Sequence, residues 1–124
     1  MSINPNPSKY FELKNLSSAQ EDVNAQVFTK YYDSGELLLR GRSIDNQLNG
    51  RGQVFYRNGN IHCDLMYKDN QMHGICKGYY LNGVLALEVL FDMGRAVYGY
   101  YYKKSGKKTL MTQTQLERKS DDGL

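Results

Sequence analysis

The sequence predicts an all-β protein: an open, single-layer antiparallel meander of repeated β-hairpins, with about eight or nine strands. Three observations predict it. Turn-forming triplets recur about every 12 residues, aromatic pairs recur at twice that spacing, and apolar and polar side chains alternate between the turns. Self-similarity at a fixed period is typical of repeat architectures. A chain of 124 residues forms one domain with a modest core.

Turn signals divide the chain into strand-length pieces. Their first residues are 12, 12, 12, 12 and 11 residues apart, and a further signal follows at Lys104-Ser105-Gly106. The triplets are Asp33-Ser34-Gly35, Asp45-Asn46-Gln47, Arg57-Asn58-Gly59, Asp69-Asn70-Gln71, Leu81-Asn82-Gly83 and Asp92-Met93-Gly94. Intervals of this length suit a strand and are too short for a helix with its connections. Asn58-Gly59 and Asn82-Gly83 predict type I′ turns, in which both residues adopt positive φ.

These turns make successive strands antiparallel neighbours and fix which residues share a face. The predicted pairs are Val54 with Cys63, Tyr56 with Ile61, Leu65 with Cys76 across a loop at Asn70-Gln71, Cys63 with Gly78, and Tyr80 with Leu85. The resulting apolar face consists of Leu37, Leu39, Val54, Tyr56, Ile61, Cys63, Leu65, Tyr67, Tyr80, Leu85, Leu87, Val89, Phe91, Tyr98, Tyr100 and Tyr102. The polar face carries Arg40, Arg42, Arg51, Gln53, His62, Asp64, Lys77 and Glu88.

A single layer leaves its apolar face uncovered, so the sheet must curl, be covered by the N-terminal segment or pair with a second copy. Residues 1–24 are an N-terminal extension, in which residues 10–16 suit a strand and residues 17–24 a wide turn or a short helical segment. Residues 25–117 form the hairpin-repeat domain, with a final strand expected within residues 107–117. The charged tail, residues 118–124, is expected to fray.

Composition narrows the function classes. The net charge of +3 is too small to predict a nucleic-acid partner. The polar start of the chain lacks a secretory pattern, and the longest apolar stretch falls short of the roughly 20 residues that span a bilayer. A cytoplasmic location is therefore expected, with both cysteines as reduced thiols.

No catalytic or cofactor-binding motif is present in the sequence, and the glycines are explained by the turns. We therefore expect neither an enzyme nor a cofactor. A metal site is also not expected. The predicted register puts Cys63 and Cys76 on the apolar face and His62 and His73 on the opposite one, where four ligands cannot converge. The expectation is core thiols and surface histidines.

The repeated unit begins with an aromatic pair and a turn ending in Gly, and continues through a strand, an Asp-x-x-x-x-Gly stretch and a second aromatic pair. This pattern resembles the MORN repeat, and is closest to the bacterial variant found in YwqK-type antitoxins. The resemblance covers residues 31–102, and the period of the third unit slips by one residue. It implies an elongated, curved sheet that presents a surface to other molecules, with an antitoxin or immunity-like role as one implication.

The aromatic row is the strongest candidate for a binding site. Tyr31, Phe55, Tyr79 and Tyr101 are predicted on the polar face, one per hairpin repeat, flanked by Arg51 and Lys77. Tyr and Arg are favoured at protein interfaces, so a protein partner is expected, with a toxin as one identity. Cross-strand packing is the alternative. The alternative function is binding to an anionic membrane surface, through Lys103, Lys104, Lys107 and Lys108. The sequence is also compatible with a homo-oligomer.

Overall fold

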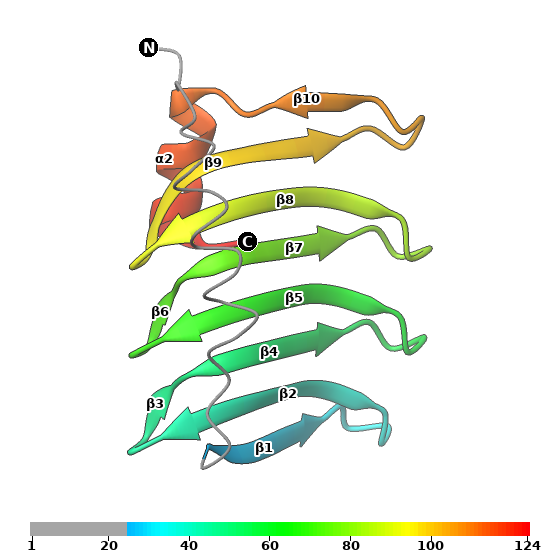
Figure 1. The fold of residues 1–124 in the computed structure, drawn as a ribbon. Coiled ribbons are helices and arrows are strands. Elements are labelled where there is room, and N and C mark those ends of the chain that lie inside the picture. Colours follow the sequence, from blue (N-terminus) through cyan, green and yellow to red (C-terminus); the bar gives the residue numbers. More distant parts are fainter. Residues whose placement is uncertain (1–24) are drawn as a thin grey trace.

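The computed structural model describes residues 25–124, which form one antiparallel sheet followed by a helix (Figure 1). The elements are β1 (Gln26–Tyr31), β2 (Leu37–Ile44), β3 (Gln47–Leu48), β4 (Gly50–Phe55), β5 (Ile61–Lys68), β6 (Gln71–Met72), β7 (Gly74–Tyr79), β8 (Leu85–Asp92), β9 (Arg95–Tyr102), β10 (Lys108–Leu110) and α2 (Gln113–Asp122). Residues 1–24, for which the sequence predicts a strand and then a wide turn or short helical segment, lie outside the described residues.

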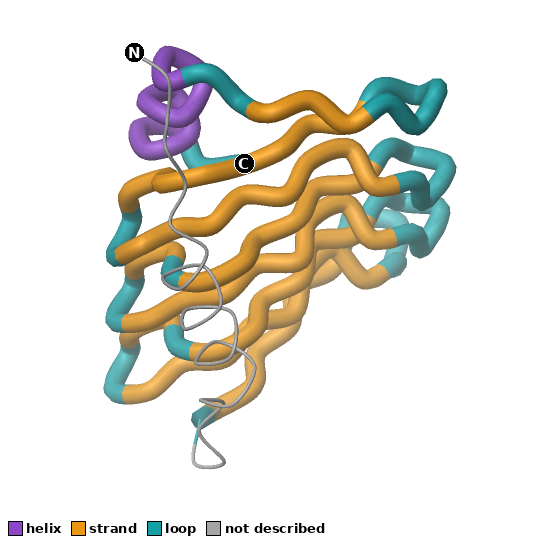
Figure 2. The backbone as a smooth tube through the Cα atoms, turned by 45° about the horizontal axis from the view of Figure 1, so that its top comes forward, coloured by secondary structure: helices purple, strands orange, loops and turns teal. Residues whose placement is uncertain are grey.

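The sheet is an open meander, as predicted. Its strand order is β1-β2-β4-β5-β7-β8-β9-β10, and the two-residue strands β3 and β6 pair with β2 and β5. Each consecutive pair is antiparallel, and β1 and β10 form the two edges. Seen from a second direction, the strands form one twisted layer (Figure 2). The structure has no helix between Tyr31 and Tyr102, which confirms the all-β prediction for this segment.

The turns at one end of the strands differ from those at the other end. Asp45-Asn46 and Asp69-Asn70 have positive φ at both residues, between 49° and 68°, as tight two-residue hairpin turns require. The prediction of this geometry at Asn58-Gly59 and Asn82-Gly83 is wrong, because only the glycine of each pair has positive φ. At those sites a wider loop forms. The Tyr56 N–H donates to the Asn60 carbonyl at 2.9 Å, and the Tyr80 N–H to the Val84 carbonyl at 2.8 Å.

The wider loops change the predicted register locally. Val54 pairs with Cys63 and Cys63 with Gly78, as predicted. The expected pairs of Tyr56 with Ile61 and Tyr80 with Leu85 are wrong. Irregularities in the ladder instead pair Phe55 with Ile61 and Tyr79 with Leu85. The loop expected at Asn70-Gln71 is also displaced, since Lys68 pairs with Gln71 across Asp69-Asn70.

A third irregularity, between Leu90 and Phe91, reverses the predicted faces of β9. Tyr98 pairs with Leu90, and Tyr100 pairs with Glu88, so both tyrosines lie on the polar face. Tyr102 lies two residues beyond Tyr100, on the same face, so the prediction that all three tyrosines share the apolar face is wrong. Tyr101 pairs with Leu87 and packs against the core instead. An extra residue in one strand moves every following side chain to the other side, because side chains alternate.

The core lies under the C-terminal half of the sheet, where α2 covers the apolar face. Its buried residues are Leu65, Cys76, Val89, Phe91, Ala96, Met111 and Leu116. Thr112 begins α2 with a capping box. The Thr112 side chain accepts from the Gln115 N–H, and the Gln115 side chain accepts from the Thr112 N–H. The final strand expected within residues 107–117 is the short β10, and the rest of that range leads into α2. The tail expected to fray completes the helix.

Glycines on the core face let large side chains lie flat on the strands. A Cβ on Gly41 would come 2.6 Å from Cζ of the Phe28 ring, closer than real Cβ contacts. Gly52 lies beneath Tyr67, with 3.5 Å between the place of a Cβ and the ring. Aromatic rings therefore cover the backbone in the N-terminal half, where α2 does not reach.

Candidate functional site

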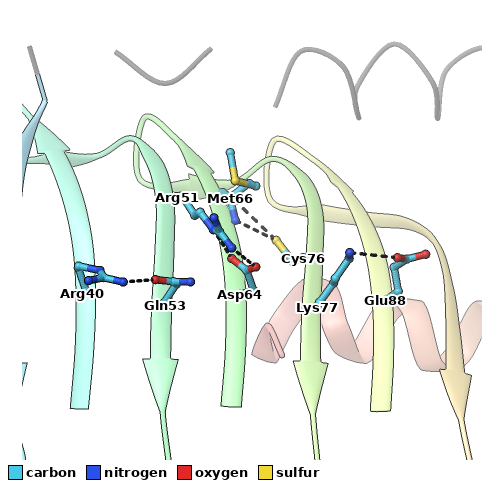
Figure 3. A network of polar contacts seen from close by, with 8 residues as sticks. All are labelled: Arg40, Arg51, Gln53, Asp64, Met66, Cys76, Lys77 and Glu88. Atoms are coloured by element: carbon cyan, nitrogen blue, oxygen red, sulfur yellow. Dashed lines mark hydrogen bonds and ion pairs between the residues drawn. The ribbon is translucent and has the colours of Figure 1, made fainter. Parts of the chain in front are cut away.

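A row of polar side chains runs across the face opposite α2 (Figure 3). Consecutive pairs in the sheet align one residue from each of five strands, β2, β4, β5, β7 and β8. These residues, the polar lane, are Arg40, Gln53, Asp64, Lys77 and Glu88. All five were predicted on this face.

Interactions within the sheet neutralise most of this lane. Arg51 lies next to the polar lane and donates two parallel hydrogen bonds to the Asp64 carboxylate, from Nε to Oδ1 at 2.8 Å and from Nη2 to Oδ2 at 2.7 Å. Lys77 Nζ lies 3.8 Å from Glu88 Oε2, and Arg40 Nη2 donates to Gln53 Oε1 at 2.7 Å. Fork-to-fork geometry makes the Arg51–Asp64 pair the best defined of these. The lane therefore offers ordered, compensated charge and no bare positive patch.

Three predicted aromatic residues lie on the same face. Alternation along each strand puts Tyr31, Phe55 and Tyr79 on the side of the polar lane. Tyr31 is 60% exposed, and the other two are half-buried. The Arg40 guanidinium lies 5.9 Å from the centroid of the Phe55 ring. Burial raises the pKa of the Tyr79 phenol, and the nearby Asp64 carboxylate raises it further.

The fourth member of the row is Tyr102, and the prediction of Tyr101 is wrong. Tyr101 packs against the core cluster on the opposite face. The irregularity between Leu90 and Phe91 shifts the repeat by one residue, so Tyr102 takes the place that Tyr79 has one repeat earlier. The hydroxyl of Tyr80 donates to the Tyr102 carbonyl at 2.6 Å, just as the hydroxyl of Tyr56 donates to the Tyr79 carbonyl at 2.7 Å. The aromatic row of the structure is therefore Tyr31, Phe55, Tyr79 and Tyr102.

A second set of tyrosines holds this row at a fixed spacing, and the sequence reasoning missed it. Three hydroxyls each donate to a main-chain carbonyl of the row one repeat further along the chain. This hydroxyl ladder consists of Tyr32 to Phe55 at 2.6 Å, Tyr56 to Tyr79 at 2.7 Å and Tyr80 to Tyr102 at 2.6 Å. The recurrence of Tyr directly after Tyr31, Phe55 and Tyr79 is the signal that could have revealed it.

The four lysines near the last turn are exposed, as expected of solvated charge. Two of them also contact aromatic rings: Lys108 Nζ lies 3.9 Å from the centroid of Tyr100, and Lys104 Nζ lies 5.9 Å from that of Tyr80. Lys103 and Lys107 close the loop through a main-chain hydrogen bond of 2.9 Å. Part of the cluster is therefore engaged within the sheet. Within residues 25–124, no helix is long and apolar enough to cross a bilayer.

The cysteines and histidines do not form a metal site. In the described part of the chain, no three His, Cys, Asp or Glu side chains are grouped to hold an ion. Both cysteines are free, and burial raises the pKa of the Cys76 thiol to about 12. The expectation that both histidines lie on the surface is wrong for His73, which is 8% exposed. His73 Nδ1 accepts from the Met93 N–H at 3.1 Å, as Asn49 Oδ1 accepts from the Asp69 N–H one repeat earlier.

Comparison with known proteins agrees with this repeat geometry. Residues 48–69 and 72–93 each match the MORN repeat variant. Each match contains one wide loop of the meander, residues 56–60 or 80–84, together with its flanking strands. The chain is thus similar to MORN repeats over these two segments. No curated protein and no solved structure matches it.

Proposed function

We propose that this chain is a noncatalytic protein-binding module whose contact surface is the aromatic row above the polar lane. The observation that supports it most is the placement of Tyr31, Phe55, Tyr79 and Tyr102 at equivalent places of successive repeats, on the face opposite α2. Aromatic side chains supply large contact areas with little conformational freedom to lose, which suits the centre of an interface.

The polar lane would act as a rigid base for these rings. Arg51 and Lys77 were expected to contact the partner directly. Because Arg51 pairs with Asp64 and Lys77 with Glu88, each would meet the partner as half of an ion pair. The Arg51 side chain is 50% exposed and is held in a single orientation by its two bonds. A partner would meet it as part of an ordered pair, which favours specificity over raw attraction.

The open edge of β1 would provide a second contact. Among residues 25–124, β1 pairs only with β2, so its outer row of main-chain donors and acceptors would accept an added strand. Val27 and Tyr31 of this strand are 56% and 60% exposed. The resemblance to MORN repeats supports a binding role. The finer resemblance to YwqK-type antitoxins supports a toxin-like protein as the partner. The free thiols support a cytoplasmic location.

A capture experiment tests this proposal. The full chain, a Phe55→Ala/Tyr79→Ala variant and a Leu81→Ala/Val84→Ala control serve as baits in a native lysate, and captured proteins are quantified by mass spectrometry. The control removes two side chains that are 59% and 43% exposed but lie at the wide loop, off the row. A partner retained by the full chain and the control but lost by the row variant supports the proposal. Equal capture by all three baits, or global unfolding of the row variant by circular dichroism, refutes it.

A further inference from the structure

The apolar face of the sheet is covered at one end only. The buried apolar side chains lie in β5, β7, β8 and β9 and in the segment from β10 into α2. In β1, β2 and β4 the only buried residues are Gly41 and Gly52. Leu39 pairs with Val54 and Val54 with Cys63 on this face, and both Leu39 and Val54 remain half-exposed. The N-terminal half of this face therefore has an apolar surface without a described cover.

A groove marks this uncovered region. It holds a pocket of about 150 Å³, and its apolar walls are Phe28, Leu39, Leu48, Val54, Leu65 and Tyr67. Gly41 and Gly52 also line it, and the Phe28 and Tyr67 rings lie over their backbone. An apolar cavity of about this volume accommodates a benzene ring. One aromatic or branched aliphatic side chain would fill it.

We propose that residues 10–16 of the same chain occupy this groove. The segment concentrates Tyr10, Phe11, Leu13 and Leu16 within a short stretch of an otherwise polar extension. The chain outside the described residues is 24 residues long and ends at β1, whose Phe28 forms one wall of the groove. The occupant is therefore tethered beside its site.

The geometry of the tether permits this contact. The eight residues between Leu16 and Ala25 reach about 26–29 Å when extended, at about 3.3–3.6 Å per residue. Neighbouring strands lie about 4.8 Å apart, so crossing from β1 to β4 needs much less. A short tether also gives an effective concentration in the millimolar range, which a second copy of the chain reaches only in very concentrated solution. The proposed contact lies on the face opposite the aromatic row, so it is independent of partner binding there.

Photo-crosslinking in the full chain tests the proposal. A benzophenone amino acid replaces Leu39 in the groove, and a matched control carries it at Thr29, in β1 on the polar face. After irradiation and trypsin digestion, a crosslink within one chain to the peptide of residues 10–14 is expected for position 39 and not for position 29. Crosslinked dimers, or no crosslink to residues 10–16, would overturn it. If the Leu39 variant does not fold, Val54 serves as the probe position.

A charge substitution sharpens the result. Phe11→Asp/Leu13→Asp, combined with the probe at position 39, should lose the crosslink and gain binding of an apolar fluorescent dye. Asn4→Asp/Asn6→Asp adds the same charge outside the apolar stretch and should leave both signals unchanged. An Asp variant that retains the crosslink, or a control that loses it equally, contradicts occupation by these side chains.

Discussion

Replacing the three hydroxyl-ladder tyrosines, Tyr32, Tyr56 and Tyr80, with Phe should destabilise the sheet without altering either face. Each substitution keeps the ring and removes one O–H donor. The three lost bonds are 2.6, 2.7 and 2.6 Å long, and all are partly buried. A typical intramolecular hydrogen bond contributes about 0.5–1.5 kcal/mol net. The triple variant should therefore lose about 3 kcal/mol, a large part of the roughly 5–15 kcal/mol that stabilises a typical protein.

The same bonds join successive repeats, since each spans 22 or 23 residues of chain. In repeat proteins the contacts between neighbouring units provide much of the cooperativity. The triple variant should thus unfold over a broader range of urea as well as at a lower midpoint.

Urea unfolding followed by circular dichroism, with the single variants alongside, measures both effects. Tyr31→Phe is the matched control, because its side chain is 60% exposed and it belongs to the row and not to the ladder. If the triple variant stays within about 0.5 kcal/mol of the parent, which is the range of ordinary surface substitutions, the ladder contributes nothing to stability and the reasoning fails.

Two further predictions concern single positions. Met93 has φ of 47°, a conformation that costs most residues about 1–2 kcal/mol and Asn less, so Met93→Asn should raise the thermal midpoint; an unchanged or lower midpoint would contradict this. Burial raises the Cys76 pKa from 9.0 to about 12, so above pH 9 the unfolded state loses a proton that the folded state keeps. The free energy of unfolding should therefore fall between pH 9 and 12 by up to about 1.4 kcal/mol per pH unit from this thiol, and Cys76→Ala should fall less steeply in urea titrations across that range. A parallel fall in both proteins would assign the effect to other groups, such as Tyr67, whose pKa burial also raises.

Periodicity was sufficient to predict the meander because the turn signals, the aromatic pairs and the two-face pattern all favour the same strand pairing. The pairs Val54–Cys63 and Cys63–Gly78 follow directly from it. The helix α2 escaped prediction because its only fully buried side chain is Leu116. One apolar contact among charged residues gives little helical periodicity, and the tertiary contact with the sheet stabilises the helix instead.

The aromatic row was predicted only as far as the register holds. Tyr31, Phe55 and Tyr79 precede the last ladder irregularity, and each lies on the expected face. Tyr101 follows that irregularity, and the shift of one residue exchanges it with Tyr102. The sequence shows the slip as the 23 residues from Gly83 to Gly106, where Gly35, Gly59 and Gly83 are 24 apart. It does not show which strand accommodates it, because that depends on how Phe91 and Ala96 pack in the core.

The two ends of the sheet pose the same physical problem. A stack of repeats needs terminal caps, because the outermost units cannot bury their apolar side chains alone. At the C-terminal end α2 meets this need: Leu116 fills the core, and Ser120 Oγ accepts from the Ala96 N–H at 2.8 Å, where the β8–β9 ladder is irregular. At the other end Phe28 and Leu39 have no equivalent cover among the described residues. In the proposal above, the apolar residues of the N-terminal extension provide the second cap, on the face opposite the aromatic row.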